Sequence, residues 1–82
     1  MPVKITIIGL GQIGASIGLA LAAHKDRVVT VGHDKEYSIE QRAKKLGVVN
    51  ETNHNLPSSV ENADLVILAL PVNEIRETLG HI

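Results

Sequence analysis

Three glycines near the amino terminus have the spacing of a turn that binds phosphate. Gly9, Gly11 and Gly14 form the pattern G-x-G-x-x-G between a run of β-branched residues and a helical pattern. Gly9 would allow a tight turn, Gly11 would let the backbone lie against a pyrophosphate, and Gly14 would let the helix pack closely on the strand. Unpaired backbone amides at the N-terminus of the helix would then bind the phosphates without a cationic side chain.

An acidic residue follows at the distance that such a turn requires. Asp34 lies 20 residues after Gly14 and just beyond an expected strand at residues 28–31. A carboxylate at this place can accept hydrogen bonds from the adenosine ribose hydroxyls, and it would repel a 2′-phosphate. We therefore expect NAD as the cofactor rather than NADP, with the adjacent Lys35 partly offsetting the repulsion.

The end of the last apolar run is a second candidate for cofactor contact. Pro71 ends this run because proline donates no hydrogen bond to a sheet. Since ligands bind at the carboxyl ends of strands in open α/β sheets, residues 70–73 could border the central part of a cofactor. An ordinary strand end followed by a helix explains the proline equally well.

No residue pattern indicates catalysis or a metal site. The four histidines are the only candidates for acid–base chemistry near neutral pH, and we expect each on the surface, although His33 could touch the adenine side of a nucleotide. No pair of carboxylates has the spacing of an acid and a base, and no His/Asp/Glu cluster has metal-ligand spacing. The histidines are His24, His33, His54 and His81.

Apolar runs of strand length alternate with helical patterns along the chain, which predicts a parallel α/β fold with flanking helices. We expect strands at residues 3–8, 28–31, 48–52 and 65–70, helices at 12–23 and after Asn73, and a helical turn at 57–62. Another helix would have a capping box at Ser38 and Gln41 and end at Gly47. On the first helix, residues 13, 17 and 21 would form one apolar face, and Gly14 and Gly18 a second line that allows close packing.

Composition narrows the class of protein further. The chain has 82 residues, a formal charge of −1, 44% hydrophobic residues and no Phe, Trp or Cys. This composition excludes disulfides and thiolate metal sites, and it offers neither stacking aromatics nor a basic stripe for nucleic acid or an anionic membrane. Glycines interrupt the longest uncharged stretch, so we expect no membrane span or signal peptide and a cytoplasmic protein.

Three segments resemble the opening of the prephenate and arogenate dehydrogenases, the enzymes of tyrosine biosynthesis. They are ITIIGLGQIGASIGLAL, VGHD and ADLVILALPV, and together the resemblance covers nearly the whole chain. The resemblance implies a Rossmann-type NAD(P)-binding domain and, for the full enzyme, oxidative decarboxylation of prephenate or arogenate by hydride transfer to NAD(P)+. The family's further strands, catalytic histidine and helical C-terminal domain would lie beyond Ile82, so residues 1–82 would form a partial dinucleotide-binding domain, truncated after the fourth strand and its following helix. From the motif and the resemblance together, the expected cofactor contacts are Gly9, Leu10, Gly11, Gln12, Ile13, Gly14, Asp34, Lys35, Ala69, Leu70 and Pro71.

Truncation would leave apolar surface exposed. In the usual strand order 3-2-1-4-5-6, the strand at residues 65–70 would become an open edge without strands five and six. This strand is equally apolar on both faces, so we expect a homo-oligomer that covers the edge.

Other functions fit parts of the pattern. Regulatory nucleotide-sensing modules of potassium transport proteins also use G-x-G-x-x-G with an acidic strand end, but the proline after the fourth strand favours a dehydrogenase. Related 6-phosphogluconate-dehydrogenase-like reductases share much of the pattern. A methyltransferase that binds S-adenosylmethionine fits less well, because the third glycine implies the closer packing of a dinucleotide site.

Overall fold

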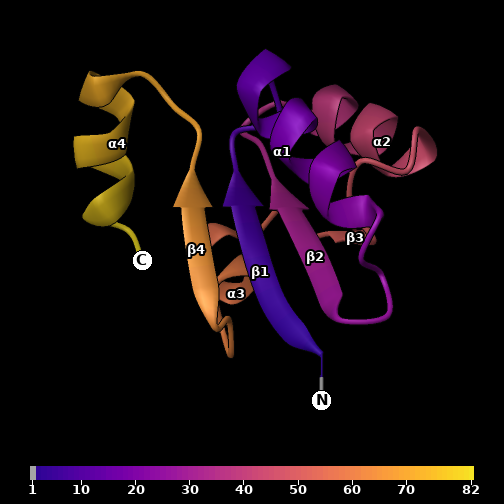
Figure 1. The fold of residues 1–82 in the computed structure, drawn as a ribbon. Coiled ribbons are helices and arrows are strands. Elements are labelled where there is room, and N and C mark those ends of the chain that lie inside the picture. The colour runs from indigo at the N-terminus through magenta and orange to yellow at the C-terminus, as the bar shows by residue number, and fades with distance from the viewer. Residues whose placement is uncertain (1) are drawn as a thin grey trace.

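The computed structural model describes residues 2–82 and shows a parallel four-stranded sheet with flanking helices (Figure 1). The strand order is β3-β2-β1-β4, as in the first half of a Rossmann-type domain, and the predicted fold class is confirmed. The strands are β1 (Val3–Ile8), β2 (Val28–His33), β3 (Glu51–Thr52) and β4 (Leu65–Leu68). The helices are α1 (Gln12–Ala22), α2 (Tyr37–Lys45), α3 (Leu56–Ser59) and α4 (Val72–Leu79).

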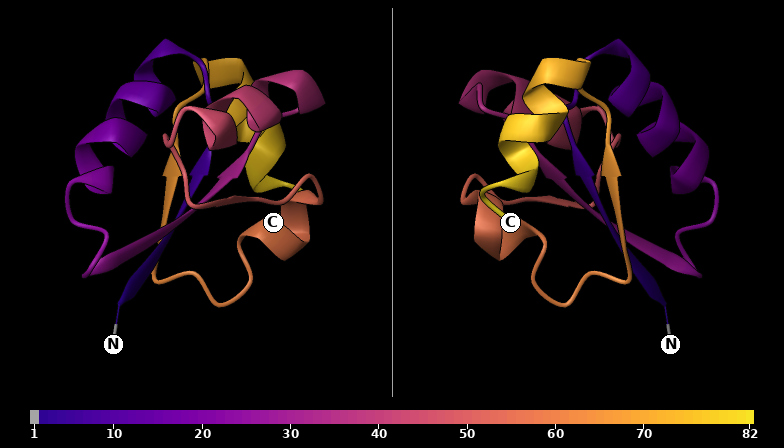
Figure 2. Two further views of the ribbon diagram at one scale, coloured as in Figure 1. Left: turned by 90° about the vertical axis from the view of Figure 1, so that its right-hand side faces the viewer. Right: turned by 90° about the vertical axis from the view of Figure 1, so that its left-hand side faces the viewer.

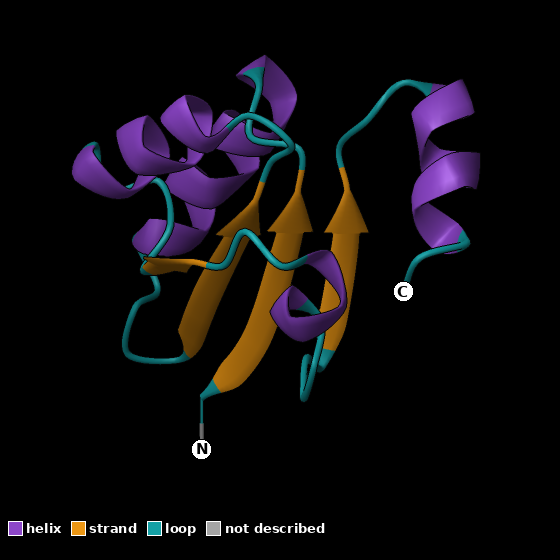
Figure 3. Ribbon diagram, turned by 180° about the vertical axis from the view of Figure 1, so that it is seen from behind, coloured by secondary structure: helices purple, strands orange, loops and turns teal. Residues whose placement is uncertain are grey.

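The central strand β1 is buried on both faces. Ile5 and Ile7 belong to the apolar core cluster together with residues of α1, α2 and the loop before β3. Thr6 points to the opposite face, where its hydroxyl donates a hydrogen bond of 2.6 Å to the carbonyl oxygen of Ser59 in α3. Helices α1 and α3 accordingly lie on opposite sides of the sheet (Figure 2), and α3 stands in front of β1 and β4 when the molecule is seen from behind (Figure 3).

The two buried glycines of α1 allow the helix to approach its neighbours closely. A Cβ on Gly14 would overlap the carbonyl oxygen of Gly9, and a Cβ on Gly18 would overlap that of Val48 in the loop after α2. The predicted small-residue line is therefore confirmed as the inner face of α1. The prediction for Ile13 was wrong, because the residue is 70% exposed, whereas Ile17 and Leu21 of the same predicted face are partly buried and pack against the core.

Strand β2 and helix α2 begin or end differently from the prediction. β2 does not stop at residue 31, because Gly32 and His33 continue the pairing with Ile7 and Ile8 of β1. The predicted Ser38 capping box is wrong, since α2 already begins at Tyr37 and its N-cap has no side-chain hydrogen bond. Gly47 adopts the expected left-handed conformation after the helix, with φ of +75°.

The later elements are shorter than predicted or shifted. β3 contains two residues rather than five, and the helical turn forms at Leu56–Ser59 instead of residues 57–62, where the Asn55 side chain caps it. β4 ends at Leu68, before the predicted boundary, because β1 offers it no pairing residue beyond Ile8. Asn73 lies inside α4 and does not cap it.

Helix α4 stands beside β4, apart from the other helices (Figure 1), and none of its residues is buried. Leu79 in its last turn is 56% exposed. β4 is the edge strand of the sheet within residues 2–82, and its first residue, Leu65, is half exposed. In the same range no helix has the length and apolar character needed to cross a membrane.

The close approach of α1 gives a prediction about stability. Gly18→Ala should lower the free energy of unfolding by about 1 to 3 kcal/mol, because the added methyl group has to displace the backbone at Val48. Gly11→Ala is the matched control, because no atom lies within 4 Å of a Cβ built on Gly11. Urea denaturation of both variants checks this prediction, and equal stability of the two would contradict it.

Candidate functional site

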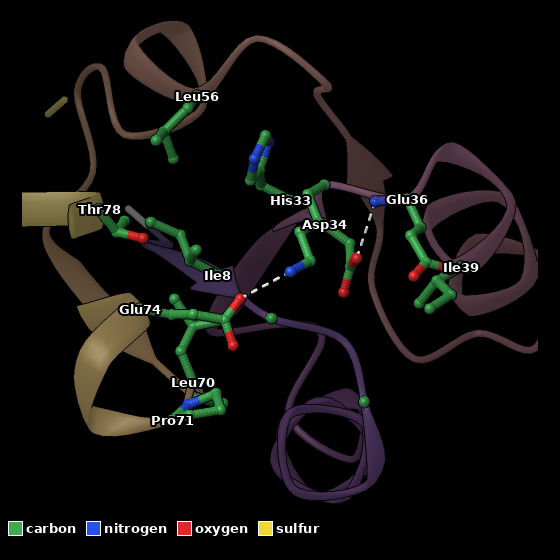
Figure 4. A pocket seen from close by; sticks show the side chains of 14 residues that line it. Ile8, His33, Asp34, Glu36, Ile39, Leu56, Leu70, Pro71, Glu74 and Thr78 are labelled. Atoms are coloured by element: carbon green, nitrogen blue, oxygen red, sulfur yellow. Dashed lines mark hydrogen bonds and ion pairs between the residues drawn. The ribbon is translucent and has the colours of Figure 1, made fainter. Parts of the chain in front are cut away.

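A cavity of about 280 Å³ lies at the carboxyl edge of the sheet (Figure 4). Its walls come from the glycine turn after β1, the turn after β2, the segment after β4 and one side of α4. The structure brings together around it seven of the expected cofactor residues, which are Gly9, Gly11, Asp34, Lys35, Ala69, Leu70 and Pro71.

The other four expected residues do not line this cavity. Leu10 and Gln12 lie beside a second cavity of about 310 Å³ between α1 and α2, which Gly11 also borders. Ile13 is exposed, and Gly14 is buried against the backbone of Gly9.

The glycine turn leads into a helix N-terminus that no side chain caps. Gly9 has φ of +94°, a conformation that other L-residues rarely adopt, and its amide donates to the carbonyl oxygen of His33 at 2.8 Å. The first hydrogen bond of α1 runs from the Ala15 amide to the Gly11 carbonyl oxygen at 2.8 Å. No side chain caps the N-terminus and no acidic residue occupies the first turn, so this end of the helix keeps its positive potential.

The Asp34 carboxylate joins the two turns at the carboxyl edge. Its Oδ2 atom accepts a hydrogen bond of 2.9 Å from the amide of Leu10, and its Oδ1 atom accepts one of 2.9 Å from the amide of Glu36. An ionised carboxylate offers about four lone-pair sites, so both oxygens retain capacity to accept from a ligand hydroxyl. The carboxylate is thus fixed beside the glycine turn and faces the cavity.

A buried carboxylate supports Asp34 from behind. Glu40 in α2 is 1% exposed, and its Oε2 atom accepts hydrogen bonds of 2.9 Å from the Asp34 amide and 3.0 Å from Nδ1 of His54. His33 Nδ1 lies 3.6 Å from the same oxygen and donates to the carbonyl oxygen of Asn53 at 3.0 Å. The prediction that His33 lies on the surface was wrong, because the residue is 8% exposed as the last residue of β2.

Our sequence analysis missed Glu40, although the sequence contained a signal for it. Glu40 precedes Ala43 by three residues, a spacing that places both on one side of a helix, and the structure buries that side of α2. A charged residue on an inner face needs partners, so its position already pointed to a polar contact near the end of β2.

Lys35 and Glu74 form an ion pair between two walls of the cavity. The Nζ atom of Lys35 lies 2.9 Å from Oε1 of Glu74 in α4, and Figure 4 shows the Glu74 carboxylate pointing toward the turn that carries Asp34. The hydrogen bond from Lys35 and the negative charge of Glu74 raise the pKa of Lys35 above its ordinary value of 10.5.

A parallel sheet with this strand order, a glycine turn after β1 and a carboxylate after β2 defines the Rossmann class of dinucleotide-binding domains. Within this class, the chain belongs to the family described as NADP oxidoreductase, coenzyme F420-dependent, whose sequence profile matches residues 4–82.

Known dehydrogenases are similar to nearly the whole chain. The prephenate dehydrogenase of Lactococcus lactis subsp. cremoris is 37% identical over 79 residues, which are 96% of this chain and 22% of that protein. The arogenate dehydrogenase of Synechocystis has a similar structure, with a TM-score of 0.80 and 29% identity over 93% of this chain and 26% of that one. The prephenate dehydrogenase of A. aeolicus, solved with hydroxyphenyl propionate and NAD+, has a TM-score of 0.84 and 24% identity over 95% of this chain and 28% of that one. The resemblance seen in the sequence is confirmed, and the chain spans about a quarter of the length of these relatives.

The burial of Glu40 gives a prediction about stability. Glu40→Ala should lower the free energy of unfolding by about 2 to 4 kcal/mol, because it leaves the Asp34 amide without its acceptor and opens a void. Glu40→Gln should lower it less, since an amide oxygen can still accept from Asp34. The control is Glu61→Ala at an exposed position, for which a change within about 0.5 kcal/mol is expected. Chemical denaturation measures all three, and a Glu40→Ala variant as stable as the control would contradict the assigned role.

Proposed function

We propose that residues 1–82 form the ADP-binding part of an NAD-binding domain in a dehydrogenase of the prephenate or arogenate type. The observation that carries this proposal is the Asp34 carboxylate, held by hydrogen bonds beside the glycine turn and the uncapped N-terminus of α1. One ligand that has a pyrophosphate next to an adenosine ribose matches both features.

The glycine turn fits the pyrophosphate. The amides of the first turn of α1 precede the first helical hydrogen bond at Ala15, so they are free to donate to phosphate oxygens. The open space around the missing Cβ of Gly11 allows the close approach that this contact requires. The turn therefore compensates the negative charge of a pyrophosphate with backbone dipoles.

The cavity fits the adenosine. Asp34 would accept hydrogen bonds from the ribose hydroxyls, and Ile39 and Leu56 supply apolar walls for a base. The segment after β4 borders the same cavity, so Ala69, Leu70 and Pro71 would lie along the central part of the cofactor. Bound NAD+ supplies a hydride acceptor, and the residues of this chain bind and orient it.

The charges around the cavity favour NAD over NADP. The carboxylate of Asp34 would repel a 2′-phosphate, and the Glu36 carboxylate adds a second negative charge on the same turn. The name of the matched family mentions NADP, whereas the solved A. aeolicus relative contains NAD+. The local charges support the second of these for this chain.

We extend the proposal from the described site to the activity and location of the whole protein. By similarity to the prephenate and arogenate dehydrogenases, the whole protein would oxidise and decarboxylate prephenate or arogenate with NAD+, in the cytoplasm. The similarities to prephenate and arogenate dehydrogenases favour this function over a nucleotide sensor or a methyltransferase.

Calorimetric titration tests the proposed function. NAD+ and ADP-ribose should bind with similar affinity and NADP+ more weakly, because the described site contacts the ADP part of the cofactor. Asp34→Asn should narrow the gap between NAD+ and NADP+ by about tenfold, since it removes the charge but keeps an oxygen that can accept from Leu10. Binding of S-adenosylmethionine in place of NAD+ and ADP-ribose, or of none of the three, would contradict the proposal.

We also propose that the chain forms a homo-oligomer. β4 presents an unpaired edge in the part of the chain that the structure describes, and half-exposed Leu65 lies on it. Sedimentation at high micromolar concentration should show a species larger than a monomer. A lysine placed on this edge, as Leu65→Lys, should shift the equilibrium toward the monomer. A monomer throughout the concentration range would contradict this prediction.

A further inference from the structure

One hydrogen bond between side chains connects helix α4 to the turn that carries Asp34. None of the helix's residues is buried, and the hydrogen bond from Lys35 Nζ to Glu74 Oε1 is the only one between side chains that links α4 to another element within residues 2–82. Glu74 and Thr78 follow each other by one turn and both line the cavity. One face of α4 thus forms a wall of the site.

Lys35 is the only lysine or arginine among the described residues that line this cavity, and three carboxylates accompany it. Asp34 and Glu36 are its chain neighbours, whereas Glu74 approaches from α4 and takes its ammonium group in direct contact. The direct contact places the cation at the α4 wall rather than beside the ribose-binding carboxylate. The raised pKa of Lys35 is consistent with this assignment, since the Glu74 hydrogen bond and charge are its largest causes.

We propose that Glu74 is a specificity-determining residue, which disfavours a ribose 2′-phosphate by holding the Lys35 ammonium group in an ion pair at the α4 wall. This inference rests on the proposed nucleotide-binding function. A 2′-phosphate beside Asp34 would need a cation to balance its charge, and Lys35 is the nearest one along the chain. The Glu74 carboxylate competes with a 2′-phosphate for that cation.

The same pair is able to exchange partners. The side chain of Lys35 is 76% exposed and has a flexible stem, so its ammonium group can move from a carboxylate to a phosphate without disturbing the core. Without Glu74, Lys35 would face only the carboxylates of its own turn and would be free to contact a 2′-phosphate.

The test compares two ligands that differ only in the phosphate, ADP-ribose and 2′-phospho-ADP-ribose, by calorimetry at low ionic strength. Glu74→Gln should tighten binding of the phosphorylated ligand by about threefold to tenfold and change binding of ADP-ribose by less than about twofold. Glu77→Gln is the matched control, an identical substitution at an exposed position of the same helix that does not line the cavity. It should change neither affinity.

A variant without the lysine shows whether Glu74 acts through Lys35 or repels the 2′-phosphate directly. The quantity compared is the logarithm of the fold-change in affinity for 2′-phospho-ADP-ribose that Glu74→Gln causes. In the Lys35→Met variant this quantity should be less than about half of its value in the wild-type chain. Titration of Lys35 by NMR gives a readout independent of nucleotide: its pKa should fall toward 10.5 in Glu74→Gln and not in Glu77→Gln. Unchanged amide chemical shifts outside α4 and the Asp34 turn show that the variants are folded.

The outcomes separate the role of Glu74 from the proposed nucleotide-binding function. If the wild-type chain binds ADP-ribose and Glu74→Gln leaves the ratio of the two affinities unchanged, the role of Glu74 is overturned and the nucleotide site stands. An equal effect of Glu74→Gln with and without Lys35 also overturns it, because Glu74 would then act by its own charge. If the wild-type chain binds neither ligand, the proposed function fails, and the inference about Glu74 fails with it.

Discussion

Two hydrogen bonds through Asp34 hold the candidate site together. The Leu10 amide donates to the Asp34 carboxylate, and the Asp34 amide donates to Glu40, each over 2.9 Å. The first bond joins the glycine turn to the end of β2, and the second joins that end to α2. Because β1 and β2 are parallel neighbours, their carboxyl ends lie together, and these bonds fix the two turns relative to each other. A ligand that contacts both turns therefore meets groups that are already ordered, which lowers the entropy lost on binding.

The burial of Glu40 explains why this arrangement persists. A carboxylate that is 1% exposed has lost its hydration, so its contacts with the Asp34 amide and with His54 must compensate. Movement of the Asp34 turn away from α2 would remove one of the two hydrogen-bond donors to this buried oxygen and would leave the Asp34 amide without its acceptor. The penalty for that movement restrains the turn more strongly than an exposed hydrogen bond would.

The sequence was sufficient to predict features that follow from local rules. The glycine turn and the acidic strand end each depend on a short pattern with one structural solution, and the strand order is the usual one for a fold that has both. Features that depend on tertiary contact were missed. Ile13 matches the apolar helical face of Ile17 and Leu21, but in the first turn of α1 it is exposed, while the other two pack against the core. Ser38 and Gln41 match a capping box, but the bond from the Glu36 amide to Asp34 belongs to a turn that starts α2 earlier.

The site combines fixed and adjustable charges, and the two kinds have different effects. Asp34 is held on both oxygens by backbone amides, so its charge stays beside the glycine turn whatever ligand is present. Lys35 and Glu74 interact at the surface, where an ion pair contributes little to stability and exchanges partners readily. The fixed charge of Asp34 disfavours a ligand that carries a 2′-phosphate. The Lys35–Glu74 pair adds a second, adjustable contribution to this discrimination at the contact between α4 and the Asp34 turn.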